Sequence, residues 1–295
     1  MDSDFADTAS EQTNINDWKR WRVHMKGLKT MSDLRPDGFH GLGNHTALMA
    51  WWLDLVGCSV LDQVPQFEMP QDLVLLDVDH GSKSFDIRQQ ASHMIDMYPE
   101  MLGIMRGLHM MEGIATIVAQ NSEQTEFWRD EVRGIELIGP ATHFLLTTPR
   151  FQSSIDEDES SVTLLVQELL RLTCLLLLSG LKRCLSLNAS DCEAIQQRFW
   201  KIWGVKGQPI AGVLQDLALW TAETTTMAES IEVAQSAHWC NWFVVRMQSL
   251  SLTIRRYKTP DYLSLLDSTA HGSAPSDSAA NADILPSHPP GSLTA

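Results

Sequence analysis

The sequence predicts an all-α protein, a single multi-helix domain followed by a disordered C-terminal tail. Apolar residues recur at spacings of three and four through most of the chain, which is the period of one helix face. One short apolar-acidic run, residues 73–81, could form a brief strand, but it has no second strand with which to pair. After Leu266 the composition changes to Ser, Ala, Pro, Asp and Gly, with no apolar period.

Composition divides the chain into three parts. Residues 1–15 are polar and acidic, and we expect a flexible N-terminus there. Residues 16–266 form the predicted helical domain, since 295 residues at 44% hydrophobic content can bury one large core. Residues 267–295 cannot bury enough apolar surface to offset the entropy lost on ordering, so we expect a disordered tail.

The first predicted helix begins with Asn16 as its N-cap and ends at Pro36-Asp37-Gly38. One face carries an apolar stripe, and the opposite face carries basic side chains. The stripe consists of Trp18, Trp21, Met25, Leu28 and Met31, and the basic face of Lys19, Arg22, Lys26 and Lys29. Trp18, Trp21 and Met25 form the candidate interaction surface, because an uncovered aromatic patch seldom persists on a monomer. The alternative is that one or both of these tryptophan rings fold back onto the helix that carries Trp51 and Trp52. His24 lies beside the stripe, and we expect it to pack there.

Further helices follow from the same periodicity. A second helix starts at Asn44 and presents an apolar face that includes Trp51 and Trp52, before an irregular stretch over residues 64–70. The later helices are expected over residues 84–119 (with a break near Tyr98-Pro99), 122–138, 142–146, 162–187, 191–203, 210–221 and 230–255. The acidic block at residues 156–160 suits the positive end of the helix that follows it.

The charge balance restricts the partners. The net charge is -15, from 22 basic and 37 acidic side chains, so a phosphate backbone is repelled and we expect no direct nucleic-acid binding. The most lipid-like run, residues 172–181, is half of the ~20 apolar residues that span a bilayer. We therefore expect no membrane partner, and residues 1–15 do not resemble a signal peptide.

The chain carries no recognisable catalytic or metal motif. The five cysteines are separated by gaps of 116, 10, 8 and 48, so no C-x-x-C pair exists and a binuclear zinc cluster cannot form. We expect buried, reduced thiols instead. A G-x-S-x-G elbow, a phosphate-binding loop and a helical His pair with a neighbouring Glu are also absent. We expect no cofactor, no metal and no catalytic residue. Weak cation sites at His40 and His45, or at Asp77, Asp79 and His80, are less favoured than plain surface loops.

Several motifs occur in a particular order. They are His24–Met31 with Leu34-Arg35, the glycine-rich run Gly38–Gly43, Gln167–Leu176, Leu217–Trp220 and His238–Phe243. Together they resemble the regulatory domain of fungus-specific transcription factors, a helical domain that usually follows a binuclear zinc cluster. The positions that match the family's motifs are His24, Gly27, Leu28, Arg35, Arg171 and Trp220. The expected Gly-Gly after Arg35 is replaced by Pro36-Asp37.

The resemblance implies a transcription-linked regulatory domain that acts through protein–protein contact and lacks its own DNA-binding module. It implies a nuclear location, with the cytoplasm as the alternative. We expect a protein partner or a second copy of the chain at the first helix, and a small apolar molecule as a further ligand. Three other interpretations stay open: a stand-alone helical small-molecule-binding module, an uncharacterised enzyme, and a truncated gene product. A Met- and Trp-lined cavity would favour the first, and convergent polar groups with shifted pKa values would favour the second.

Overall fold

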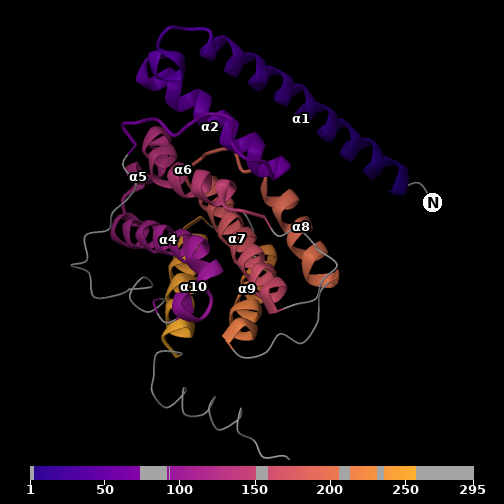
Figure 1. Ribbon diagram of the computed structural model, residues 1–295, viewed down its shortest axis with the longest axis vertical. Helices are drawn as coiled ribbons and strands as arrows, with labels where there is room; N and C mark the ends of the chain where they lie inside the picture. The colour runs from indigo at the N-terminus through magenta and orange to yellow at the C-terminus, as the bar shows by residue number, and fades with distance from the viewer. Residues whose placement is uncertain are drawn as a thin grey trace, which may run out of the picture. The chain divides into compact units, whose positions relative to one another are not determined.

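The computed structural model describes residues 3–73, 92, 94–150, 159–205, 213–230 and 236–256 (Figure 1). It describes the backbone alone at residues 3–16, 40, 159–161, 205, 213, 230, 236–237 and 256. Within these ranges every regular element is a helix, which confirms the predicted all-α class. Residues 1–258 group into one compact unit and residues 259–295 into another. The predicted tail, residues 267–295, lies outside the described residues.

Helix α1 spans Ser3–Asp33, and the 3-10 helix η1 follows at Gly38–Gly41. The helix therefore starts well before Asn16, and the prediction that Asn16 is its N-cap is wrong. Ala, Glu and Gln residues precede Asn16, and such residues extend a helix at little cost once a downstream turn has formed. Gly38 has a φ of +57°, a left-handed conformation that glycine adopts without strain, and it turns the chain towards α2.

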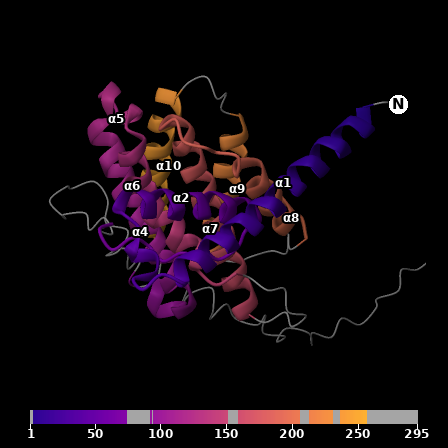
Figure 2. The same cartoon turned by 90° about the horizontal axis from the view of Figure 1, so that it is seen from above.

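Helix α2 spans Asn44–Leu61 and lies beside α1 in both views (Figures 1 and 2). Trp51 and Leu55 on this helix are fully buried. The helix ends at Asp62, whose φ of 51° and ψ of 56° place it in the left-handed region, and the Asp62 N–H donates to the Cys58 carbonyl. Aspartate tolerates this conformation better than most residues. The irregular stretch at residues 64–70 is present as predicted.

The next helices are the 3-10 helix η2 at Pro99–Met101, α4 at Leu102–Asn121, α5 at Thr125–Arg129 and α6 at Glu131–Thr147. The predicted break near Tyr98-Pro99 is confirmed, but the predicted break between residues 138 and 142 is wrong. Helix α6 continues through Pro140. Pro140 removes one backbone hydrogen bond, while its buried neighbours Ile138 and Ala141 keep the segment in the core.

Helix α7 spans Glu159–Cys184 and occupies the centre of the bundle, in contact with α4, α6, α8, α9 and α10 (Figure 1). Gly180 allows α10 to approach closely, because a Cβ atom there would lie 2.0 Å from the Trp239 indole. By length and composition, residues 99–121 and 162–184 could each cross a membrane. Their apolar windows are 72% and 89% buried by the protein itself, so other helices already cover these surfaces.

The remaining helices are α8 at Cys192–Val205, α9 at Val213–Ser230 and α10 at Ser236–Arg256. Helix α9 continues nine residues past its predicted end at Thr221. The threonines in this extension that face the core, Thr224 and Thr225, are fully buried, as is Thr221. The Thr221 hydroxyl donates to the Ala218 carbonyl at 2.6 Å, so this polar side chain is satisfied within the helix.

Candidate functional site: the outer face of helix α1

The inner face of α1 packs on α2. The Trp21 indole lies so close to Gly57 that a Cβ atom on Gly57 would be 2.2 Å from the ring. Met25 is only 5% exposed, and Trp18 contacts Trp21 edge-on with ring centroids 6.0 Å apart. The predicted interaction surface of Trp18, Trp21 and Met25 therefore needs correction. Gly57 provides space for an indole, so α2 uses the inner face and Met25 is not accessible to a partner.

The outer face of α1 carries a second apolar stripe that the periodicity analysis missed. Val23 is 71% exposed, Met31 62% and Leu34 81%. Gly27 lies between Val23 and Met31, and a Cβ atom built on it would meet nothing within 4 Å. Val23, Gly27 and Met31 lie on α1, and Leu34 is the first residue after it, where its N–H still donates to the Thr30 carbonyl at 3.2 Å and continues the last turn. At a helical period, spacings of four, four and three place these residues within about 80° of arc. Met31 was predicted to join the buried stripe, and this prediction is wrong. We call Val23, Gly27, Met31 and Leu34 the outer stripe.

Basic side chains border the outer stripe. Lys19, Arg20, Arg22 and Lys26 are all exposed. The segment 17–35 holds six basic and two acidic side chains, a net charge of +4, whereas the entire chain carries -15. Both acids have basic neighbours: Asp33 pairs with Lys29 at 2.5 Å and Asp17 with Arg20 at 3.8 Å. Residues 3–16 of the same helix hold Asp4, Asp7 and Glu11 and no basic residue. The cationic, partly apolar surface is therefore confined to the C-terminal half of α1 and the residues directly after it.

The structure does not bring the family-motif residues together into one site. Gly27 and Arg35 are exposed, and Leu28 is half-buried on α1. His24 is also exposed, so the expectation that it packs beside the apolar stripe is wrong. It falls between the two apolar faces of a helix that contacts the bundle on one side. Arg171 and Trp220 are buried on α7 and α9, where they contribute to the core.

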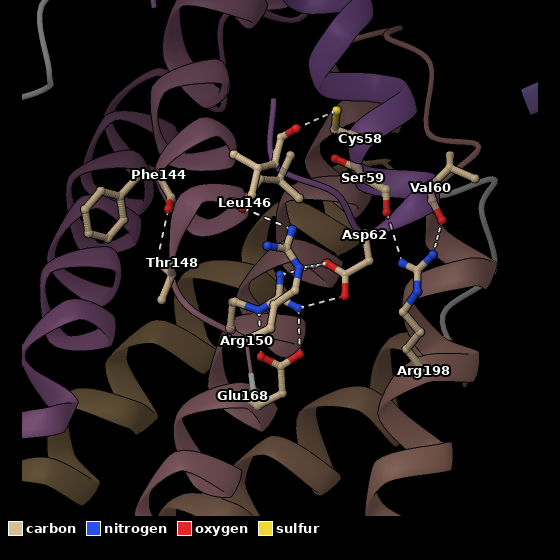
Figure 3. A network of polar contacts seen from close by, with 12 residues as sticks. Cys58, Ser59, Val60, Asp62, Phe144, Leu146, Thr148, Arg150, Glu168 and Arg198 are labelled. Atoms are coloured by element: carbon tan, nitrogen blue, oxygen red, sulfur yellow. Dashed lines mark hydrogen bonds and ion pairs between the residues drawn. The ribbon is translucent and has the colours of Figure 1, made fainter. Parts of the chain in front are cut away.

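Arg171 belongs to a buried polar network that sequence reasoning missed (Figure 3). Its Nη1 lies 3.0 Å from Oδ1 of Asp62, and its Nη2 donates to Asp62 Oδ2 at 3.1 Å. Its Nε also donates to Glu168 at 2.8 Å. Burial opposes ionisation of Asp62, yet the Arg171 guanidinium, assisted by Arg150, holds the pKa of that carboxyl below its ordinary value. The network therefore keeps an ion pair charged inside the protein.

Two further arginines cap helix ends in the same network. Arg150 donates to Asp62 at 3.3 Å and to the Leu146 carbonyl near the end of α6 at 3.1 Å. Arg198, on α8, donates to the carbonyls of Ser59 and Val60 near the end of α2. Cations near a helix C-terminus satisfy its unpaired carbonyls and its negative dipole end. Because each arginine is engaged by protein acceptors, we interpret the network as structural.

Two other buried carboxylates are equally engaged. Asp54 on α2 accepts hydrogen bonds from the backbone N–H groups of Gln66 at 2.5 Å and Phe67 at 3.1 Å. Burial raises the pKa of Asp54, and those hydrogen bonds oppose the rise. Asp191 pairs with Lys182 at 2.5 Å and accepts from Ser179 at 2.8 Å. Both carboxylates hold a loop against a helix through these contacts, so we interpret both as structural.

Two surface hollows lie near the start of α2 and of α6. The larger has a volume of about 400 Å³ and the smaller about 350 Å³, and both are bordered by Asp72, Leu73 and Glu136. Their linings mix acidic, polar and aliphatic side chains, and the smaller hollow is also lined by Phe127 and Arg133. They do not have the Met- and Trp-lined character that would favour a pocket for a small apolar molecule.

The described ranges contain no group of three His, Cys, Asp or Glu side chains placed to hold a metal. Of the proposed weak cation sites, Asp77, Asp79 and His80 lie outside the described residues, as does the side chain of His40. All five cysteines are buried, as expected, and none forms a disulfide. Comparisons of the chain with protein-family models, curated proteins and solved structures find no match, so the resemblance to fungal regulatory domains stays a prediction.

Proposed function

We propose that this chain is a regulatory domain that acts in transcription through protein–protein contact, and that the outer face of α1 makes the contact. The observation that supports this proposal is the outer stripe, in which Val23 and Met31 on α1 and Leu34 directly after it are each more than 60% exposed. Exposed apolar residues scattered singly are normal, but a contiguous group is typical of an interaction site.

The way in which α1 is held also supports an interaction role. Its inner face is fixed on α2 through Trp21 and Met25, so the outer stripe is presented by a helix that is already ordered. A preformed surface avoids the entropy cost of ordering a segment at the moment of binding. A partner would therefore meet a preformed apolar ridge bordered by cations.

The link to transcription rests on the order of the family-like motifs along the chain. In the fold, Arg171 and Trp220 hold the helical core, while Gly27, Leu28 and Arg35 lie on or next to α1. By the same resemblance we propose a nuclear protein that depends on another module for DNA binding. The mixed linings of the two hollows offer no specific support for a small-molecule-binding function.

A reporter assay tests this proposal. The chain is fused to an unrelated DNA-binding module, and transcription from the matching promoter is compared with that given by the module alone. We expect the fusion to change transcription and the double variant Val23→Glu/Leu34→Glu to abolish that change. Leu252→Glu is the matched control, because Leu252 is 57% exposed on α10 and receives the same chemical change. A silent fusion, or equal effects of both variants, would contradict the proposal.

A further inference from the structure

We infer that the partner which covers the outer stripe is an acidic amphipathic helix of another protein. This inference rests on the proposed function, because it specifies the chemistry of the partner at the same surface. It is carried by three properties of the outer face of α1: its length and shape, its charge, and its mismatch with other classes of partner.

The outer stripe has the dimensions of a helix-docking site. Residues 23–34 cover about 17 Å at 1.5 Å per residue, or three helical turns. Gly27 forms a low point in the middle of the stripe, where a second backbone can approach with no side chain in between. An extended peptide has nothing to pair with here, because the backbone groups of α1 are already bonded within the helix. A helix can instead lay its own apolar ridge along the stripe.

The charge around the stripe selects an acidic partner. Lys19, Arg20 and Lys26 are exposed around the stripe, and the segment 17–35 is positive by +4. Glutamate and aspartate side chains on the borders of a partner helix would meet these cations. Such complementarity sets orientation and speeds encounter, and like charges at the same positions oppose binding.

The same features disfavour a second copy and a membrane. A contact between two copies that is centred on their outer stripes would place cationic borders against each other. A helix that lies on a bilayer inserts a large apolar face, often with Trp, but the tryptophans of α1 face α2 or lie beside it. The outer stripe holds three apolar side chains, and the net charge of -15 opposes approach to anionic lipid.

The test measures binding of two designed helical peptides to the full chain by fluorescence anisotropy. Both peptides carry the same apolar residues at i, i+4, i+7 and i+11, with Glu at the bordering positions in one and Lys in the other. We expect the Glu peptide to bind at least about tenfold more tightly than the Lys peptide, and added salt to weaken it. Val23→Glu/Leu34→Glu should reduce its affinity at least about tenfold, while Leu252→Glu should leave it unchanged.

Several results would overturn the inference. They are no binding of the Glu peptide, equal binding of the two peptides, or binding that the double variant leaves intact. Two more results would assign another occupant: a dimer in light scattering that the double variant dissociates, or binding to vesicles with phosphatidylserine that the variant abolishes. The reporter assay separates the two proposals. If the reporter responds while the Glu peptide fails, the partner chemistry alone is wrong, and if the peptide binds while the reporter is silent, the role in transcription is wrong.

Discussion

Arg171 on α7 holds Asp62, the left-handed residue that ends α2, through contacts of 3.0 and 3.1 Å. The two residues are 109 positions apart in the sequence, and Arg171 is completely buried. Removing one member of a buried ion pair is destabilising, because the other charge stays in the core with less compensation. Without Asp62, the buried Arg171 would keep Glu168 as its carboxylate partner. This relationship makes Asp62 the most informative position for testing the stability of the fold.

Asp62→Asn should lower the free energy of unfolding by about 2–4 kcal/mol, because Arg171 loses a charged acceptor while asparagine still tolerates the left-handed backbone. Urea denaturation followed by circular dichroism measures the change. Arg35→Ala is the control, since Arg35 is exposed, and its effect should stay within about 0.5 kcal/mol. A loss below about 0.5 kcal/mol for Asp62→Asn would show that the network adds nothing to stability.

The effect of Asp62→Asn should depend on pH. The pKa of Asp62 is lowered in the folded protein, so its stabilising contribution is complete above the unfolded value of about 3.9 and is lost as pH falls through the folded pKa. The difference in unfolding free energy between wild type and variant should therefore be full at pH 7 and shrink below about pH 4. Asp54, whose pKa is raised, acts in the opposite direction in both proteins and cancels in the difference. A difference that grows on acidification would contradict the proposed ion pair.

Two glycine-to-alanine variants should have opposite effects. Gly57→Ala places a methyl group 2.2 Å from the Trp21 ring, so we expect a loss of about 1–3 kcal/mol and a red-shifted tryptophan emission. Gly27→Ala meets open space on an exposed helix face and should stabilise the fold by up to about 1 kcal/mol. Thermal and urea denaturation measure both. Equal effects of the two substitutions would mean that α1 does not pack on α2 as described.

Thiol labelling of the native protein should be slow and should begin at Cys184. A hydrogen bond from Cys240 lowers the pKa of Cys184 despite its burial, whereas burial raises the pKa of Cys174 to about 12. The thiolate is the reactive form, so Cys184 should account for the first labelling phase. Cys184→Ser should remove this phase and Cys174→Ser should retain it, as followed by mass spectrometry. Rapid labelling of all five thiols before denaturation would show that they are not buried.

Removal of the residues after Leu266 should leave the melting temperature nearly unchanged, because that segment has no apolar period with which to pack. Differential scanning calorimetry of the truncated and full chains measures this. A decrease of more than about 5 °C would correspond to at least about 1 kcal/mol and would mean that the segment contributes to the fold.

The sequence predicted a helix correctly where one apolar face of that helix is buried in the core. The apolar run of α7 and the Trp51-Trp52 face of α2 were predicted because burial requires a helical period of hydrophobic residues. The continuation through Pro140 was missed, because tertiary packing outweighed a local propensity. The outer stripe was missed for another reason: Val23 and Leu34 are separated by basic residues and form a line only when the helix is built.

The buried polar network shows a second limit on what can be predicted from the sequence. Asp62, Arg150 and Arg171 come from positions 88 and 109 residues apart, and no local pattern indicates which acid meets which base. A single charge within an apolar run was a usable signal, as with Asp54 next to Leu55. Such a residue must find a partner once it is buried. The identity of the partner depends on how the helices pack.

The attachment of α1 also determines how the protein opens. Its principal contacts are with α2 and η1 through one face. The end of α2 is instead held by Arg171 on α7, by Arg198 on α8 and by Arg150, which also donates to the end of α6. The protection of backbone amides from hydrogen exchange should therefore change abruptly at Gly41 and Gly43, just before Asn44. The amides of α1 should exchange through a low-energy detachment of that helix, and those of α2 through global unfolding. Each detachment uncovers Trp21 and Met25 together with the bare backbone of Gly57. A chaperone or protease that samples this open form would recognise a surface absent from the closed one.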